Sequence, residues 1–324
     1  MGKAHDFSII MCGQITMDDL VLMDEPVKRD NMGGDYIYGL SGAFMWGRDR
    51  IGSCVRVGND FDTDLIRKAT RDEVDLSGAV KVDMPGLRTF ELFDRYGNRY
   101  FVRQKWAGDD TKLACDSISD YPEKYRGNTD SICIAPIPFP YSYNFIKQIP
   151  SGDAVLMVDP HFDSVYEKDR PKWEEIFPKI DIWAPSESEL TDFFGIGRKE
   201  DIKDYIPYLR QVASMGVDTV VLKIGERGSM AYERDSGRTW HVPPCRSRGI
   251  VDVTGCGDTF CGGFISGYLR RRDVLEALMY GSVAASFCIE HYGSLDNFHV
   301  GKEEADKRFS EYSGDLDRSG CLVG

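Results

Sequence analysis

Gly255-Cys256-Gly257-Asp258 combines two glycines and a carboxylate directly before a predicted helix. Glycines let successive backbone amides converge, and such a nest at a helix N-terminus can hold an oxyanion. A carboxylate in the first turn, here Asp258, can take the proton from a hydroxyl group as it attacks a phosphoryl group. Phosphoryl transfer depends chiefly on positioning and electrostatic stabilisation, so these residues are a candidate site for it.

Two glycine-rich nucleotide-binding motifs do not fit this chain. A Walker P-loop needs Gly-Lys followed by Ser or Thr, whereas Gly2-Lys3 and Gly301-Lys302 precede Ala and Glu. A dinucleotide fingerprint needs a third glycine where this chain has Phe260, and it belongs early in the chain. From the residues alone, an ordinary glycine-rich turn with Asp258 stabilising the helix start is commoner than an anion site.

Composition limits the classes of partner. The 324 residues carry a net charge of −13, which argues against a general nucleic-acid binder. No apolar run approaches the roughly 18 residues that cross a bilayer, and the N-terminus lacks a secretory pattern. The nine cysteines are scattered without a CxxC pair, which is typical of reduced thiols. We therefore expect a cytoplasmic protein that binds neither membrane nor nucleic acid.

The sequence predicts alternating strands and helices as the elements that position the candidate site. Residues 187–194 and 200–215 are helix-like, and short β-branched runs predict buried strands at 7–13, 131–137, 154–160, 181–186 and 219–225. This order predicts an α/β fold with a mostly parallel sheet and helices on both faces. Ligands bind beyond the carboxyl ends of such strands, where the sequence has Asp159, Glu187, Glu189 and Lys223.

One segment follows a different pattern. Residues 86–105 alternate apolar and polar side chains around Tyr96-Gly97-Asn98, a hairpin signal. Together with 14–30 they predict a small antiparallel flap, although an ordinary edge hairpin fits the pattern equally well. The charged and then Gly/Ser-rich end, 303–324, predicts a partly frayed tail to a single domain spanning 1–324.

The segment from Asp252 to Phe264 closely resembles the C-terminal signature of ribokinase-like, PfkB-type carbohydrate kinases. The resemblance covers most of the chain: it extends to Gly13–Asp18, the double glycine Gly33-Gly34, and residues 158–161, 184–189, 222–230 and 281–293. It implies a three-layer αβα fold whose small β-sheet lid is formed by about 14–30 and 86–105. In this family the lid often pairs two subunits, so the resemblance also implies a homodimer.

The resemblance implies ATP-dependent phosphoryl transfer to a hydroxymethyl group of a sugar or sugar derivative. Asp258 would be the general base, and the amides of Gly255, Cys256 and Gly257 would complete the anion hole. The resemblance implies that the substrate is bound by Asp18, Gly33, Gly34 and Tyr38, and we add Arg103 as a candidate contact on the flap. For ATP it implies Lys223, Gly225, Gly228 and Ser282. For metal ions it implies Glu189, helped by Glu187, for Mg²⁺, and Asp252 for a monovalent cation such as K⁺.

Two departures from the family pattern bear on the substrate and the metal. Tyr38 stands where the family commonly has Asn, and an aromatic ring there can stack on a sugar or restrict the pocket. Ser186 replaces the usual Asn of the magnesium segment, while Glu189 remains three residues later. We therefore predict a sugar kinase, with a nucleoside kinase of the same fold or a catalytically weak sugar- or nucleotide-binding regulator as alternatives.

Overall fold

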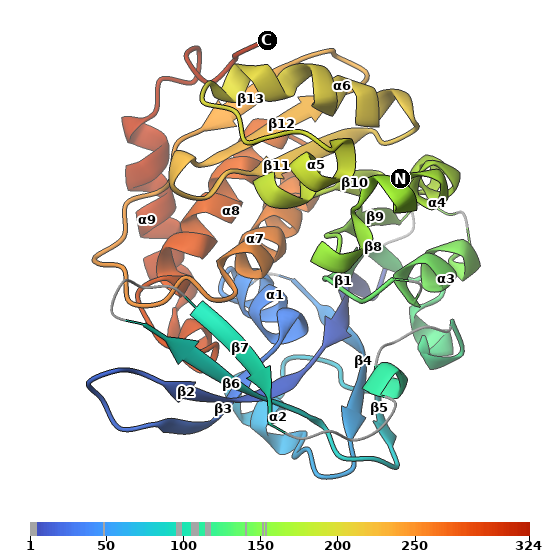
Figure 1. Ribbon diagram of the computed structural model, residues 1–324, viewed down its shortest axis with the longest axis vertical. Helices are drawn as coiled ribbons and strands as arrows, with labels where there is room; N and C mark the ends of the chain where they lie inside the picture. The colour runs from blue at the N-terminus through green and yellow to red at the C-terminus, as the bar shows by residue number, and fades with distance from the viewer. Residues whose placement is uncertain are drawn as a thin grey trace.

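A mostly parallel sheet forms the centre of the computed structural model, which describes residues 5–47, 49–94, 99–104, 110–113, 118–139, 141–150, 152 and 154–324 (Figure 1). Within these residues the sheet has nine strands, whose spatial order is β13 (Thr239–Val242), β12 (Ser229–Glu233), β11 (Thr219–Lys223), β10 (Ile182–Trp183), β9 (Val155–Val158), β8 (Thr129–Ile134), β1 (Phe7–Gln14), β4 (Ile51–Gly58) and β5 (Ala79–Val82). The strands from β11 to β5 are parallel, and β12 and β13 add antiparallel pairs at one edge.

Helices cover both faces of this sheet. Successive strand residues point to opposite faces, and the apolar side chains on each face are buried against helices. Ile9 and Met11 of β1 belong to one buried cluster, and Ile10 and Cys12 to another. The first cluster packs against α1 (Asp35–Phe44), α2 (Asp64–Ala69), α7 (Cys256–Arg271), α8 (Val274–Cys288) and α9 (Lys302–Asp315). The second packs against α3 (Tyr141–Gln148), α4 (Arg170–Ile176), α5 (Glu187–Phe194) and α6 (Ile206–Ser214).

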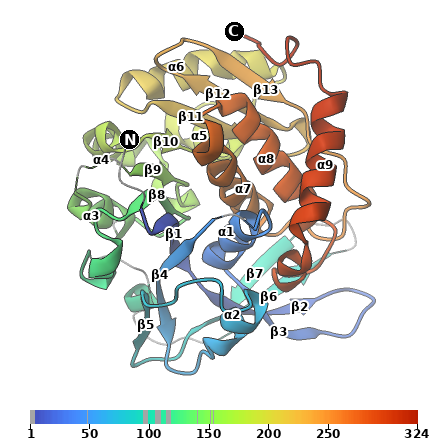
Figure 2. The same cartoon turned by 180° about the vertical axis from the view of Figure 1, so that it is seen from behind.

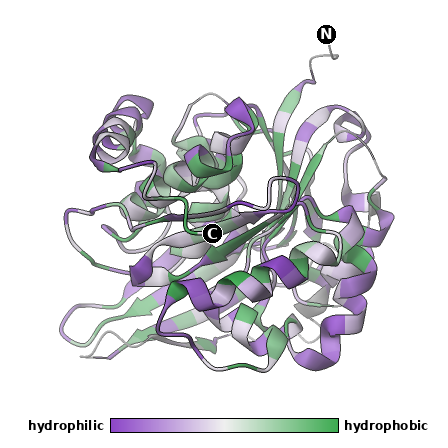
Figure 3. Cartoon of the chain, turned by 90° about the horizontal axis from the view of Figure 1, so that it is seen from above, coloured by the Kyte–Doolittle hydropathy of each residue, from purple (hydrophilic) through white to green (hydrophobic). Residues whose placement is uncertain are grey.

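This arrangement confirms the expected three-layer αβα architecture, which is visible from both sides in Figures 1 and 2. Figure 3 shows hydrophobic residues along the central strands and hydrophilic residues on the outward sides of the helices. The predicted apolar runs contribute the buried strands β1, β8, β9, β10 and β11, whereas β4, which is also buried, was not predicted. In the described part of the chain, no helix is long and apolar enough to cross a membrane.

A second, four-stranded sheet lies at the opposite end of the molecule from β12 and β13 (Figure 1). Its strands, in spatial order, are β3 (Lys28–Gly33), β2 (Thr16–Val21), β6 (Leu87–Phe93) and β7 (Arg99–Arg103). The segments 14–30 and 86–105 therefore do associate, but the expected antiparallel arrangement is wrong for the pair that joins them, because β2 runs parallel to β6. The pairs β2–β3 and β6–β7 are antiparallel. The predicted turn at 95–98 lies outside the described residues.

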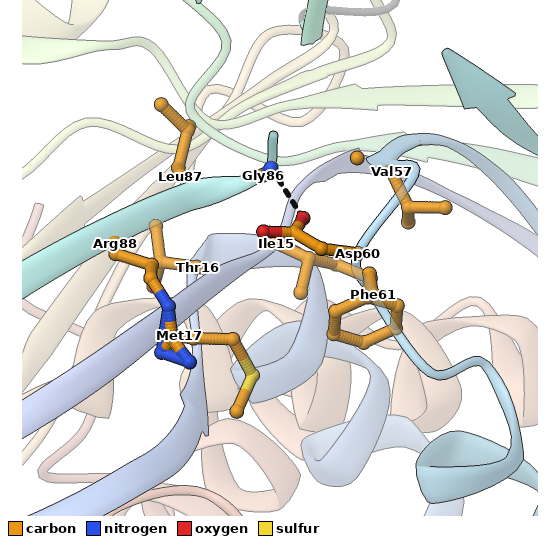
Figure 4. Close-up of a pocket in the computed structure, with 10 residues that line it drawn as sticks. Ile15, Thr16, Met17, Val57, Asp60, Phe61, Gly86, Leu87 and Arg88 are labelled. Carbon is orange, nitrogen blue, oxygen red and sulfur yellow. Dashed lines mark hydrogen bonds between the residues drawn. The ribbon is translucent and has the colours of Figure 1, made fainter. Parts of the chain in front are cut away.

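Two of the connections between the sheets, those from β1 to β2 and from β5 to β6, meet at a small hollow, which Figure 4 shows. One connection passes through Ile15 and the other through Gly86, whose amide donates to Asp60 Oδ1 at 2.7 Å. A Cβ on Gly58 would lie 2.0 Å from the Gly86 nitrogen, so only glycine permits this close approach. The hollow holds about 30 Å³, enough for one or two water molecules but not for a sugar.

The chain end is ordered against the main sheet, unlike the frayed tail expected over 303–324. Residues Lys302–Asp315 form α9, where Tyr312 is buried. Beyond it, Leu322 pairs with Trp240 of β13, and the amide of Val323 donates to the Thr239 carbonyl at 2.9 Å. The edge strand β13 thus satisfies backbone groups of the last residues, a contact that composition could not reveal.

Glycines let α7 lie directly against its neighbours, which accounts for their presence within this helix. A Cβ on Gly262 would lie 2.0 Å from the Gly39 carbonyl oxygen of α1, and one on Gly42 would lie 2.1 Å from the Thr259 carbonyl oxygen. On another side of α7, a Cβ on Gly263 would lie 2.6 Å from the Cβ of Ala284 in α8. These contacts fix the position of the start of α7 relative to the sheet.

We expect Gly262→Ala to lower the free energy of unfolding by about 1–3 kcal/mol, because the added methyl group overpacks the α1–α7 contact. Gly314→Ala is the matched control, since Gly314 also lies in a helix but nothing lies within 4 Å of its added Cβ. The control should gain about 0.5–1 kcal/mol from reduced backbone entropy. Urea unfolding measures both, and equal effects of the two substitutions would contradict the close contact.

Candidate active site

Charged side chains gather where β9, β10 and β11 end and α7 begins. Asp159 follows β9, Glu189 lies in the helix after β10, and Lys223 is the last residue of β11. Lys223 Nζ forms an ion pair with Asp159 Oδ2, and a Cβ on Gly257 would lie 3.5 Å from the same nitrogen. The glycine-rich start of α7 therefore faces the ammonium group of Lys223, which is the only ammonium group of this cluster among the described residues.

The start of α7 has the backbone geometry that the glycines imply. Gly255 is the N-cap and adopts φ +72°, a left-handed conformation that favours glycine. Its carbonyl accepts from the amide of Thr259 at 2.8 Å, so the helix begins at Cys256 and Asp258 lies in the first turn. First-turn amides and the helix dipole attract negative charge, which makes this terminus suitable for an anion.

Burial shapes the ionisation of the Lys223–Asp159 pair. Asp159 is buried, and burial raises the pKa of its carboxyl to about 6 in spite of the neighbouring ammonium. Burial by itself would lower the pKa of Lys223, but the carboxylates of Asp159, Glu189 and Asp258 raise it and keep this side chain charged. Asp159 Oδ1 has no hydrogen-bond partner among the described residues, so one acceptor oxygen remains available in the cluster.

Asp35, which sequence reasoning missed, also belongs to this site. It is the first residue of α1, and its Oδ1 accepts from the amide of Gln14 at 2.7 Å. A Cβ on Gly13 would lie 2.4 Å from this oxygen, so the carboxyl packs directly on the end of β1. Burial and the charge of Asp258 raise the pKa of Asp35 well above its usual range. An Asp opening a helix is an ordinary start signal, and only the fold brings it near Asp258.

Tyr38 lies directly against the anion nest. A Cβ on Gly255 would come within 2.1 Å of the Tyr38 ring, so the ring covers one side of this glycine. The Tyr38 carbonyl also accepts from Thr259 Oγ1 at 3.3 Å, which ties α1 to the first turn of α7. Burial raises the pKa of Tyr38, with smaller contributions from Cys288, Asp252 and Asp18. The ring therefore occupies space between the nest and the small sheet.

The small sheet contributes the predicted substrate residues. Thr89 Oγ1 donates to Asp18 Oδ1 at 2.6 Å, and a Cβ on Gly33 would lie 1.9 Å from Asp18 Oδ2. Arg103 is paired with Thr89 across β6 and β7, so it shares the face of the sheet that carries Asp18. Gly34, with φ +93°, turns the chain from β3 into α1. The turn brings α1, and with it the buried Tyr38 ring, close to Asp18.

The predicted magnesium segment divides into two parts. Ser186 caps α5: its amide donates to Glu189 Oε2 at 2.6 Å, and its hydroxyl accepts from the Glu189 amide at 3.3 Å. Glu189 is buried close enough to Lys223 for each to influence the other's pKa. Glu187 instead forms ion pairs with Arg227 and, at 3.1 Å, with Arg198. These partners hold Glu187 apart from the Lys223 cluster.

The carboxylate oxygens of this site are better suited to a metal ion that binds together with phosphate groups than to a metal ion held by protein ligands alone. In the described ranges, no three His, Cys, Asp or Glu side chains form a metal cage. Glu189 and the unpartnered Oδ1 of Asp159 nevertheless offer carboxylate oxygens beside the nest. Magnesium binds in this manner, through one or two carboxylates together with substrate phosphates.

The remaining predicted residues lie around this centre. Gly225 has φ +57° and open space where a Cβ would stand, whereas a Cβ on Gly228 would lie 2.0 Å from the Val242 carbonyl oxygen. Ser282 of α8 is buried and hydrogen-bonds with Tyr312 of α9, so its hydroxyl is used in helix packing. Asp252 is buried with Oδ1 accepting from the Thr254 amide at 2.8 Å, while Oδ2 has no partner within the described chain.

Solved structures show the same fold. A putative ribokinase II from E. coli superposes with a TM-score of 0.76 at 18% identity and covers 94% of this chain and 99% of its own. A putative ribokinase II from E. coli in complex with ATP and Mg²⁺ superposes with a TM-score of 0.75 at 19% identity, over the same shares of the two chains. The architecture is therefore the ribokinase-like fold.

Sequence comparison identifies the family. Residues 49–299 match the pfkB family carbohydrate kinases, and the chain belongs to this family. A cytidine kinase from Thermococcus kodakarensis is 27% identical over 286 residues, or 88% of this chain and 97% of that protein. An uncharacterized sugar kinase from Archaeoglobus fulgidus is 32% identical over 63% of this chain and 76% of that protein. The sequence resemblance to PfkB-type kinases is thus confirmed, with sugars and nucleosides both represented among the relatives.

The raised pKa of Asp35 predicts a pH-dependent effect of Asp35→Asn. Above about pH 4 the unfolded chain releases this proton while the folded protein keeps it, so Asp35 lowers wild-type stability as pH rises. Asparagine can still accept from the Gln14 amide. The advantage of Asp35→Asn in free energy of unfolding should therefore grow by up to about 1.4 kcal/mol per pH unit above pH 4.

Urea unfolding between pH 4 and pH 7 measures this difference. Asp235→Asn, at an exposed position, controls for the loss of one carboxylate. A difference that shrinks as pH rises would show that Asp35 is ionised in the folded protein.

Proposed function

We propose that this protein transfers the γ-phosphate of ATP to a hydroxymethyl group of a sugar or sugar derivative. The observation that carries the proposal is the juxtaposition of Asp258 with the left-handed Gly255 and the buried ammonium of Lys223 at the start of α7. A general base, a nest of amides and a cation are the components that phosphoryl transfer requires. Membership of the pfkB family supports the same activity.

Each group in the site has a role that follows from its position. Asp258 accepts the proton of the attacking hydroxyl, and the first-turn amides of Gly255, Cys256 and Gly257 stabilise charge on the transferred phosphoryl group. Lys223, held by Asp159, adds positive charge on the side of Gly257. Burial and the charge of Asp258 raise the pKa of Asp35, so this carboxyl holds its proton more readily than an exposed one and adds less negative charge beside the base.

Substrate recognition is proposed to fall on the small sheet and α1. Asp18 offers a buried carboxylate for sugar hydroxyls, Gly33 and Gly34 allow close approach, and Arg103 lies on the same sheet face. Tyr38 limits the space beside Gly255 and can stack on a ring. Closure of this sheet as a lid over the substrate would exclude water from the reaction.

A nucleoside is the second candidate substrate. The cytidine kinase relative matches nearly its whole length to this chain, and the acceptor hydroxymethyl group of a nucleoside is carried by its ribose. Asp18 would then bind ribose hydroxyls in the same way. The size of the pocket beside Tyr38, and not the machinery around Asp258, separates the two substrate classes.

ATP and Mg²⁺ are the proposed cofactors. Gly225 offers open backbone for the nucleotide, Gly228 shapes the same turn, and Glu189 is the proposed carboxylate for magnesium, which would neutralise phosphate charge. The unpartnered Oδ2 of Asp252 suits a monovalent cation such as K⁺. A cytoplasmic location is proposed from the sequence, whose cysteines are scattered without a CxxC pair.

Asp258→Asn should reduce kcat by about 10²–10⁴-fold while ATP affinity changes little, because the variant loses the base and keeps the nest. An ATP-consumption screen over sugars, polyols and nucleosides first identifies the substrate. Asp235→Asn, with an exposed side chain, should retain wild-type kcat. Near-normal kcat in Asp258→Asn would show that another group is the base. If ligands bind but none of the screened compounds is phosphorylated, the protein is a binding regulator and not an enzyme.

The edge of the small sheet leads us to propose a homodimer. Strand β7 ends the sheet, and its Tyr100 and Val102 side chains are exposed. An open apolar strand edge favours pairing with a second copy. Sedimentation should therefore give a dimer, and Val102→Lys should shift it toward monomer; a monomeric wild-type protein at micromolar concentration would contradict the proposal.

A further inference from the structure

Two thiols meet beside the anion nest. Cys256 is the first residue of α7, Cys288 is the last residue of α8, and their side chains share a hydrogen bond. Cys288 Sγ also donates to the Thr254 carbonyl at 3.4 Å, two residues before Cys256. The proposed activity assigns no role to Cys288.

The packing of α7 on α8 makes this contact a fixed feature of the fold. The helices run antiparallel, since Gly267 packs on Tyr280 and Gly263 packs on Ala284. A Cβ added at either glycine would lie 2.6–2.7 Å from its neighbour in α8. Because the two helices are antiparallel, the start of α7 lies beside the end of α8, and these two helix ends carry Cys256 and Cys288.

We propose that Cys256 and Cys288 form a reversible disulfide that switches off the site when hydrogen peroxide is present. One peroxide molecule takes two electrons from the pair. Its O–O bond breaks as the Cys256 sulfur becomes a sulfenic acid and one water leaves; the Cys288 sulfur then attacks the Cys256 sulfur and releases the second water. The reverse reaction consumes two thiols of a reductant and restores both S–H groups.

Accessibility gives the two cysteines different roles. Cys256 is partly exposed, whereas the other described cysteines are buried, so the peroxide reaches Cys256 first. Cys288 is enclosed and serves as the resolving thiol. The contact with Cys288 and burial raise the pKa of Cys256, and the same contact lowers the pKa of Cys288. Peroxide therefore reacts at Cys256 because this sulfur is the accessible one, and Cys288 is the more readily ionised sulfur of the pair. A lowered pKa also favours the Cys288 thiolate that must attack in the second step.

The disulfide changes the site because a covalent bond is shorter than a hydrogen bond between sulfurs. The S–S bond is about 2.05 Å long, so the first turn of α7 is drawn toward α8. Gly255 and Asp258 flank Cys256, and a displacement of about 1 Å at such a site costs on the order of 100-fold in rate. The Tyr38 ring, packed on Gly255 and influenced by Cys288, transmits the same shift to the substrate side.

The covalent step is tested on the full-length protein without any substrate. Treatment with hydrogen peroxide followed by peptide mapping should identify a Cys256–Cys288 linkage, a mass decrease of two hydrogen atoms, and full reversal by dithiothreitol. Cys288→Ala should give no linkage, and Cys261→Ala, which removes a buried thiol, should still give it. Peroxide-treated wild type without this linkage would overturn the proposal and leave the proposed kinase activity untouched.

The functional consequence rests on the proposed function and is tested separately. Peroxide should lower the kcat of wild type by about 100-fold, reversibly, whereas Cys288→Ala should keep its basal rate and resist. ATP binding measured by calorimetry provides a second readout and should weaken on oxidation in wild type alone. A mapped disulfide with unchanged rate and ATP affinity would refute the switch. Absence of both activity and ATP binding in the reduced protein would instead contradict the proposed function, while the mapping result would still stand.

Discussion

Backbone-to-backbone contact between α1 and α7 holds the whole site in place. Gly262 lies against the Gly39 carbonyl and Gly42 against the Thr259 carbonyl, at distances that no side chain would allow. This contact sets the height of α7 above the sheet. As a result, the residues at the start of α1 reach the start of α7, and the Tyr38 ring covers Gly255. Close backbone packing of the two helices thus sets the geometry of the proposed site.

The buried charges form a second level of organisation. Three carboxyl groups, those of Asp159, Glu189 and Asp258, lie close enough to the Lys223 ammonium to raise its pKa, and Asp35 lies close to two of them, Asp159 and Asp258. This arrangement would be unfavourable if all four carboxyl groups were ionised. Burial raises the pKa of Asp35 and Asp159, which lessens the negative charge of the cluster as pH falls. The carboxyl groups of the cluster consequently favour an incoming cation or a proton transfer. The amides at the start of α7 and the Lys223 ammonium can nevertheless provide a local positive site for an anion in a protein of net negative charge.

Strand and helix types followed from local pattern to a large extent. Residues 187–194 coincide with α5, and the predicted apolar runs include β1, β8, β9, β10 and β11. The edge strand β13 and its neighbour β12 were not predicted, and neither was β4, although β4 is buried along nearly its whole length. The ordered end at 321–324 also escaped prediction, since it depends on pairing with β13. Local patterns therefore predicted most of the central parallel strands but not β4, and the pairing of the chain end with β13 depends on the tertiary structure.

Local features of the chain were enough to predict the family, the three-layer fold and a helix that begins after Gly255 and carries Asp258 in its first turn. The glycines and the signature around them are contiguous in sequence, which is why they could be recognised. Local features were not enough to predict which carboxylates act together. Asp35 and Asp258 are more than two hundred residues apart, and their proximity results from α1 packing on α7. The same holds for Glu187, which the fold pairs with Arg227, and for Cys256 with Cys288. Long-range packing sets distances and burial, and those quantities control pKa and reactivity.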